Sequence, residues 1–460
     1  MGYPVTTTSV AAAGSTFGTA TTTLSAVIAR WRWLLPVGLF AAAFCLYIPS
    51  FDAPFIILDY NHLDAIRSTD TGTFFSRIFD PSNGGRDIIG TGDLYRPIYY
   101  STFWLEYQLF GLEPLPYYVF TALLHGTNAV LVWLLARRLT GSHIASVSAG
   151  LIWAFHPEYA DAVAWVSSIT DQLLVLFALT SVLLYAAALD AKGAARWLAC
   201  GASFAAALLA LGAKEPGLAV VPIVVAYHVL LGEPDLVRER RIPWMLLPFL
   251  LIPVVYLPLR AILVGNLAMQ EDSTQLGLDV FRNIHALSGI AASPFVATEG
   301  RVPLITPVAW AGYGLIAALL LVAVLGARRE RFLVWWYFVA LGPFLTIIPS
   351  FIIGRYLYLP FVALAILGGI GIARVTEALR REAVPPYAFA LPTAALAGLI
   401  VWFGVSNADF QSELNARGEK TEAFIARVKE AYPSPPEGTR LIVAAFPPEL
   451  SLVDDDGLML

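Results

Sequence analysis

The sequence predicts an all-α polytopic membrane protein that crosses a lipid bilayer about eleven times. Hydrophobic residues make up 58% of its 460 residues and charged residues only 14%, whereas a soluble domain carries about 25% charged residues. The hydrophobic residues also lie in blocks long enough to cross hydrocarbon, which takes roughly 17–25 residues. A fold surrounded by water is therefore excluded.

The chain is expected to begin with a disordered tail and to continue with a retained first span. Residues 1–32 are rich in Thr, Ala, Ser and Gly and contain no acidic residue. No clear cleavage site follows the first apolar block, so we do not interpret it as a signal peptide. The predicted transmembrane domain covers 33–406. Its expected spans are 33–50, 116–136, 144–156, 162–188, 197–212, 216–231, 244–264, 306–326, 332–349, 357–374 and 387–405.

The basic residues predict the orientation of these spans. With a cytoplasmic N-terminus, every second connection is cytoplasmic, and 15 of the 29 Lys and Arg residues fall on that side. They are Arg30, Arg32, Arg137, Arg138, Lys192, Arg196, Arg238, Arg240, Arg241, Arg328, Arg329, Arg331, Arg374, Arg380 and Arg381. We therefore expect a multi-pass plasma (inner) membrane protein with an extracytoplasmic C-terminus.

Two outer loops, 51–115 and 265–305, are long enough to carry function. In the first, residues 94–110 read LYRPIYYSTFWLEYQLF, which suits a helix at the membrane interface. The short extracytoplasmic tail, 407–460, has a helical charge pattern up to Tyr432 and a strand-like segment at 440–446.

Asp59 is the first candidate for chemistry. It lies in the first outer loop, in PFIILDYNHLDAI, among apolar residues that should hold it near the membrane surface. A carboxylate there can be desolvated, with a raised pKa, and can serve as a general base. The alternative is that Asp59 caps a helix that begins near Asn61.

A second group of candidates lies where spans meet the outer surface. Charges at this depth usually line a polar cavity or pair with one another, although a single Lys or Arg can also extend to lipid headgroups. These residues are Arg96, His156, Glu158, Asp161, Lys214, Glu215, Arg355 and Tyr356, and Tyr95 and Asp171 are expected to support them.

The remaining polar residues favour structural roles. His125 and Asn128 share a face of the second span, where an interhelical hydrogen bond is the default explanation. His228 and His285 are isolated. No His, Asp, Glu or Cys cluster has a firm metal-ligand spacing, and no basic stripe indicates nucleic acid. Cys45 and Cys200 are expected near opposite membrane faces, too far apart for a disulfide.

Six motifs together resemble the GT-C class of membrane glycosyltransferases, and within it bacterial relatives of the protein O-mannosyltransferases, including those with tetratricopeptide repeats. The motifs are ILDYNHL, LYRPIYY, LFGLEPLPYYVFTALLHGTNAVLVWLLARRL, AFHPEYADAVAWVSSITDQLL, AKEPGLAVVPIVV and GRYLYLPFVAL. They cover about residues 34–405 in the order found in the family. No tetratricopeptide array follows the last span in this sequence.

The resemblance implies a polyprenyl-phosphate sugar as donor, a protein or glycan hydroxyl as acceptor, and inversion at the sugar. It places the base on Asp59, a second acid on Asp161, and the phosphate-binding cations on Arg96, Lys214 and Arg355. The family often has a second acid where this chain has Tyr60, so a divalent metal is not supported. Ile169 and Thr170 also replace a basic residue of the family.

Two other classes of function remain open from the sequence. One is a non-catalytic subunit of a membrane complex that keeps the fold as a scaffold, which the departure at Tyr60 favours. The other is a transporter. Transporters often show inverted repeats and broken helices near the midplane, whereas the charges of this chain gather towards one face.

Overall fold

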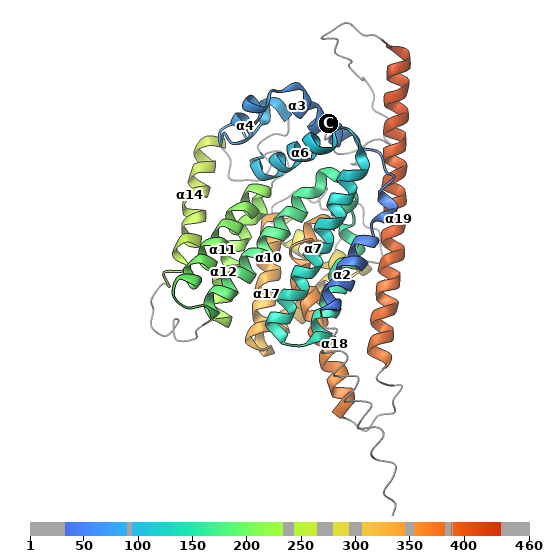
Figure 1. Cartoon of the computed structure of the whole chain (residues 1–460). Coiled ribbons are helices and arrows are strands. Elements are labelled where there is room, and N and C mark those ends of the chain that lie inside the picture. The colour runs from blue at the N-terminus through green and yellow to red at the C-terminus, as the bar shows by residue number, and fades with distance from the viewer. Residues whose placement is uncertain are drawn as a thin grey trace, which may run out of the picture.

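The computed structural model describes residues 33–89, 94–232, 243–264, 279–293, 306–345, 354–381, 388 and 390–433. In these ranges every regular element is a helix (Figure 1). The predicted all-α class is therefore confirmed. The N-terminal tail, 1–32, and the strand-like segment, 440–446, lie outside the described residues, as do 265–278 and 294–305 of the second outer loop.

Each predicted span contains one helix of the bundle. These are α2 (Leu34–Cys45), α7 (Pro114–Thr140), α8 (His143–Phe155), α10 (Ile169–Asp190), α11 (Gly193–Ala213), α12 (Val220–Leu231), α14 (Leu247–Val264), α16 (Pro307–Leu325), α17 (Arg328–Leu341), α18 (Phe361–Arg381) and α19 (Ala390–Ala431). In the described ranges, six helices are long and apolar enough to cross a membrane alone. The polytopic architecture is confirmed, and the count of eleven stays a prediction.

Four helices of the first outer loop form a cap across one end of the bundle (Figure 1). They are α3 (Ile57–Ser68), α4 (Thr71–Ile78), α5 (Arg86–Ile89) and α6 (Pro97–Phe110). The helix expected in LYRPIYYSTFWLEYQLF is thus present, and Pro97 starts it where no backbone donor is needed. Aromatic side chains attach the cap to the bundle, since the ring of Phe103 lies 5.9 Å from that of Tyr117 on α7.

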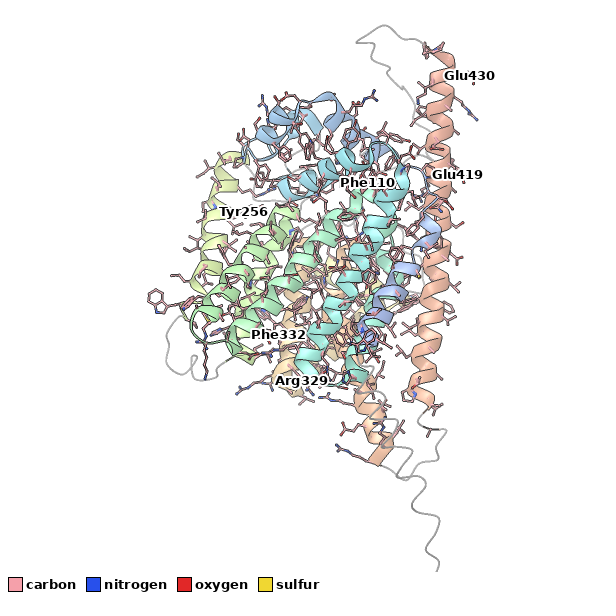
Figure 2. All side chains as sticks on the ribbon, viewed as in Figure 1. Phe110, Tyr256, Arg329, Phe332, Glu419 and Glu430 are labelled. Carbon is pink, nitrogen blue, oxygen red and sulfur yellow. The ribbon has the colours of Figure 1, made fainter. Side chains whose placement is uncertain are left out.

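Basic residues of the predicted cytoplasmic connections lie at the opposite end of the bundle. Figure 2 shows Arg329 at that end and Phe110 at the capped end. The last turn of α7 carries Arg137 and Arg138, and Arg374 of α18 binds Glu330 at 2.6 Å. This separation of charge agrees with a cytoplasmic uncapped end, although the orientation itself stays a prediction.

Small residues let the helices of the bundle pack closely. A Cβ on Gly369 of α18 would lie 2.2 Å from the carbonyl oxygen of Ala145 on α8, and one on Gly150 would lie 2.4 Å from Leu39. Close backbone approach through small residues is the usual basis of helix packing in membranes. Because α8 and α18 are pressed together, the short connections after α8 and before α18 also become neighbours.

These connections are themselves short helices: η1 (Ile48–Ser50), η2 (Pro157–Tyr159), α9 (Asp161–Ala164), η3 (Val166–Ser168), η4 (Glu215–Ala219), η6 (Gly342–Phe344) and η8 (Gly354–Leu357). The second outer loop contributes α15 (Asp279–Ala292), which packs on α16.

The last helix, α19, is one uninterrupted rod of 42 residues. The helix expected from Asn407 to Tyr432 is present, but it continues the last predicted span without a break. At 1.5 Å per residue the rod is about 63 Å long, roughly twice the thickness of the hydrocarbon core. Its C-terminal part projects past the capped end, where Figure 2 labels Glu430.

Candidate active site

The candidate site lies under the cap, where η2, α9, η3 and η8 meet. η2 and η8 pack directly on each other, and α3 of the cap packs on η3. A Cβ on Gly354 would lie 1.6 Å from the carbonyl oxygen of Glu158, so only glycine fits there. This close approach brings Arg355 beside Asp161, which are 194 positions apart in the chain.

Arg355 and Asp161 form a loose pair with unused hydrogen-bonding atoms. The Arg355 Nη1 atom lies 3.9 Å from Asp161 Oδ2 and donates to Ser168 Oγ at 2.9 Å. The guanidinium also stacks on the ring of Trp165, 4.9 Å from its centroid. Arg355 Nε and Asp161 Oδ1 are buried and have no hydrogen-bond partner among the described residues. The pair therefore has both a donor and an acceptor available for a ligand.

Lys214 is a second cation, held in a tighter pair. Its Nζ atom lies 2.5 Å from Asp171 Oδ1 and 5.8 Å from the ring centroid of Tyr356, which follows Arg355. Burial lowers the pKa of Lys214 to about 8, and the charge of Asp171 opposes this shift. Lys214 is thus charged at neutral pH but close to titration.

Arg96 is the third cation, and Glu215 neutralises it. Arg96 Nη2 donates to Glu215 Oε2 at 2.8 Å, and Arg96 Nε donates to the same carboxylate at 3.0 Å. Its neighbour Tyr95 donates weakly to the carbonyl oxygen of Phe79, at 3.4 Å. Arg96 therefore joins the cap to the segment after α11, and it has less free capacity than Arg355.

The charges of these side chains act on one another. Arg96 and Arg355 both lower the pKa of Lys214, while Arg355 and Lys214 both lower that of Asp161. The structure thus brings the three cations predicted from the sequence into one electrostatic field, with Asp161 inside it.

The carboxyl groups of Asp161 and Glu158 have pKa values close to neutral pH. Burial raises the pKa of Asp161 to about 6, although the charge of Arg355 opposes the shift. Burial and the charge of Asp161 raise the pKa of Glu158 to about 8. His156 is fully buried and its ring lies 3.9 Å from that of Phe361, so it packs against the start of α18.

Asp59 is sealed inside the protein. Its side chain has no exposed surface. Oδ1 accepts from Trp165 Nε1 at 3.1 Å, from the backbone N–H of Ser167 at 3.0 Å and from the Ser167 hydroxyl. Oδ2 accepts from the backbone N–H of Ile56 at 2.9 Å and caps α3. The capped helix begins at Ile57 rather than near Asn61, because the apolar residues before Asp59 form its first turn.

Asp59 contacts the charge cluster indirectly, through the side chain of Trp165. Burial raises its pKa to about 6, and its hydrogen bonds to Ser167, Ile56 and Trp165 limit this shift. Trp165 presents its indole N–H to Asp59 and its ring face to Arg355. Trp165, Ser167 and Ser168 were not predicted as site residues from the sequence. Their position between the acids of HPEYAD and Asp171 could have indicated that they lie close to these carboxylates.

The polar residues of the second span bind neighbouring helices. His125 Nε2 donates to the carbonyl oxygen of Ala154 at 2.9 Å, so Nδ1 accepts from the Tyr358 hydroxyl at 2.8 Å. Asn128 Nδ2 donates to the carbonyl oxygen of Gln172 at 3.0 Å. These are the interhelical hydrogen bonds expected from the sequence. In the described ranges, no group of three or more His, Cys, Asp or Glu side chains is arranged to hold a metal ion.

Comparison with known proteins adds an independent line of evidence. Residues 97–258 match the family model described as dolichyl-phosphate-mannose-protein mannosyltransferase. This range contains the cap helix α6 and the segments that carry Asp161, Asp171 and Lys214. The resemblance to the protein O-mannosyltransferases that the six motifs predicted is thus confirmed in this part of the chain.

Curated relatives match the same class. Protein O-mannosyl-transferase Tmtc2 of Drosophila melanogaster is 28% identical over 206 residues, which is 44% of this chain and 22% of that protein. Protein O-mannosyl-transferase tmtc2 of Xenopus laevis is 31% identical over 144 residues, 30% of this chain and 17% of that protein. The match therefore spans less than a quarter of the length of these relatives.

Among solved structures, the chain is similar to ArnT from Cupriavidus metallidurans bound to undecaprenyl phosphate. The TM-score is 0.49 and the identity 16%, over 84% of this chain and 72% of that one. The same protein in the apo state gives a TM-score of 0.48 and 18% identity, over 84% and 76% of the two chains.

Proposed function

We propose that this protein is a glycosyltransferase that moves a sugar from a polyprenyl-phosphate donor to an acceptor hydroxyl at the capped face. The observation that carries the proposal is the pair of unsatisfied atoms, Arg355 Nε and Asp161 Oδ1, in a field shared with Lys214. The matched family is named for a lipid-phosphate mannose donor and protein acceptors. Mannose and a protein hydroxyl are therefore the first substrates to test.

The reaction breaks the bond between the anomeric carbon and the phosphate oxygen, and forms a bond from the acceptor oxygen to that carbon. The departing phosphate changes from a singly charged diester to a monoester that approaches two negative charges. Arg355 and Lys214 are placed to stabilise this added charge, which is larger in the transition state than in the bound donor. A single displacement of this kind inverts the anomeric configuration.

We assign the acceptor's proton to Asp161. Oδ1 of Asp161 has no partner among the described residues, and its pKa near 6 leaves the group ionised yet basic at neutral pH. Asp59, on which the family resemblance placed the base, already accepts four hydrogen bonds and has no exposed surface. Its proposed task is to orient Trp165 and thereby Arg355.

We assign the apolar donor tail to a groove between α15, α16 and α18. The groove has a volume of about 450 Å³. It is lined by Ala291, Leu319, Leu364 and Phe361, and towards the uncapped end also by Glu330 and Arg374. Phe361 also touches His156, directly before the segment with Glu158 and Asp161. The proposal requires the phosphate to lie at the Phe361 end of this groove, towards Arg355, rather than at the end with Arg374. We therefore propose that the reaction takes place on the extracytoplasmic side, which is the side that the basic loops predict for the capped end.

The test is donor turnover by the purified protein in lipid nanodiscs. A panel of polyprenyl-phosphate sugars is supplied with and without peptide or glycan acceptors, and free polyprenyl phosphate is measured. We expect one sugar to be consumed, and Asp161→Asn to abolish consumption while its matched control on the exposed face of α3, Asp64→Asn, retains it. Binding of polyprenyl phosphate without turnover of any sugar would contradict the proposal and indicate a non-catalytic subunit.

A further inference from the structure

Three side-chain amides follow one another at four-residue intervals on α19: Asn407, Gln411 and Asn415. Residues at this spacing share one face of a helix. The apolar window of α19 is only 11% buried, yet Asn407 and Gln411 have no exposed surface. Burying an amide is costly unless its hydrogen bonds are satisfied. We call these three residues the amide face. Its polar side chains are tolerated only if each finds hydrogen-bond partners on neighbouring segments.

Two of the amides bind the end of the first span. Gln411 Nε2 donates to the carbonyl oxygen of Leu46 at 3.0 Å, and Gln411 Oε1 accepts from the Ser50 hydroxyl at 2.8 Å. Asn415 Nδ2 donates to the carbonyl oxygen of Pro49 at 2.9 Å. The last carbonyls of a helix lack partners within the helix. α19 therefore supplies partners for the C-terminal end of α2 and for η1.

The third amide binds the end of α8. Asn407 Nδ2 donates to the carbonyl oxygen of Phe155 at 2.7 Å, and Asn407 Oδ1 accepts from the Tyr47 hydroxyl at 3.2 Å. Phe155 is the last residue of α8, and His156 follows it. One side chain thus connects α19, the end of α8 and the end of α2.

Both bound ends lead directly into the candidate site. The chain runs from η1 to Asp59, and from Phe155 to Glu158 and Asp161. α19 also packs on η2 and α9. Further along, a Cβ on Gly418 would lie 3.0 Å from the Pro54 ring and 3.1 Å from the Pro54 carbonyl oxygen, so the helix closely approaches the loop before Asp59.

We propose that Asn407 and Gln411 are positioning residues, which hold in place from α19 the two segments that carry the carboxylates of the site. The inference rests on the proposed function for its kinetic part only. Lys214 follows α11 and pairs with Asp171 of α10, so loosening the amide face should misplace the carboxylates while leaving this phosphate-binding cation in place.

The test compares Gln411→Met, which keeps the length of the side chain and removes its hydrogen bonds, with Ser412→Met at the exposed neighbouring position. Hydrogen exchange is followed in peptides from 46–56 and 156–164. In Gln411→Met we expect exchange in 46–56 to be about tenfold faster, with α10 and α11 unchanged and Ser412→Met like the wild type. Asn407→Leu should have the same effect in 156–164, because Asn407 binds the end of α8. In both variants kcat should fall about tenfold, while KM for the donor changes less.

Exchange at the wild-type rate in both segments would overturn the inference, as would faster exchange with an unchanged kcat. If Gln411→Met does not fold, Asn415→Leu removes only the bond to Pro49 and should give the same pattern at smaller amplitude. If the wild-type protein turns over no donor, the proposed function fails. The exchange result would still show whether α19 fixes these two segments.

Discussion

Replacing Arg355 by Gln removes a charge from the candidate site and keeps a polar side chain. At about 4 Å and an effective dielectric constant near 20, one cation stabilises a unit negative charge by about 4 kcal/mol. The Arg355 side chain is 22% exposed, so solvent screening should reduce this to roughly 2–4 kcal/mol. With 1.36 kcal/mol per tenfold change in rate, kcat/KM should fall by a factor of about 30–1000.

The assay for Arg355→Gln is initial release of polyprenyl phosphate as donor concentration varies, with Arg67→Gln as a charge-matched control on the exposed face of α3. A second readout comes from Asp161, because the charge of Arg355 lowers the pKa of that carboxyl. Without Arg355, that pKa should rise and the acidic limb of the pH profile should move to higher pH. An unchanged kcat/KM would refute the phosphate role of Arg355.

Three further predictions follow from the geometry. Activity should rise with pH through about 6 as Asp161 loses its proton, and fall above about 8 as Lys214 loses its charge. Lys214→Arg should shift the alkaline fall in activity to higher pH, and a flat profile from pH 5 to 10 would exclude both roles. Asp161→Asn should reduce kcat by about 10²–10⁴-fold. Asp59→Asn should lower thermal stability by weakening the cap of α3, and should reduce kcat less than Asp161→Asn because Asp59 acts on Arg355 only through Trp165; a larger kcat loss in Asp59→Asn at unchanged melting temperature would return the base to Asp59. Gly354→Ala should abolish transfer by separating η8 from η2, while Gly201→Ala on α11, where a Cβ meets no atom within 4 Å, should remain active; equal activity of the two variants would contradict the packing argument.

Much of the architecture could be predicted from the sequence because membrane insertion constrains it strongly. In lipid each backbone polar group must be satisfied within its own segment, so a long apolar block indicates a helix. The blocks at 116–136 and 197–212 correspond to α7 and α11 in this way. The continuity of α19 was not predicted, since its second half changes from apolar to charged composition while the helical period persists.

The candidate site was only partly predictable. Charged residues at the outer ends of spans were recognisable, because such charges need partners. Whether an acid such as Asp59 or Asp161 is fully hydrogen-bonded or has a free oxygen depends on side chains from distant segments. Trp165 and Ser167 close off Asp59, while Gly354 lets Arg355 approach Asp161. Pairings between segments more than a hundred residues apart have no signature in a single sequence.

Arg355 and Lys214 are proposed to bind the phosphate of a lipid donor at the capped end. An experimental structure of the protein in nanodiscs with polyprenyl phosphate would show where this phosphate lies. We expect the phosphate within hydrogen-bond reach of Arg355 Nε and Lys214 Nζ, with the isoprenoid chain between α16 and α18. A phosphate bound instead among Arg328, Arg329 and Arg331 at the opposite end would contradict the proposal.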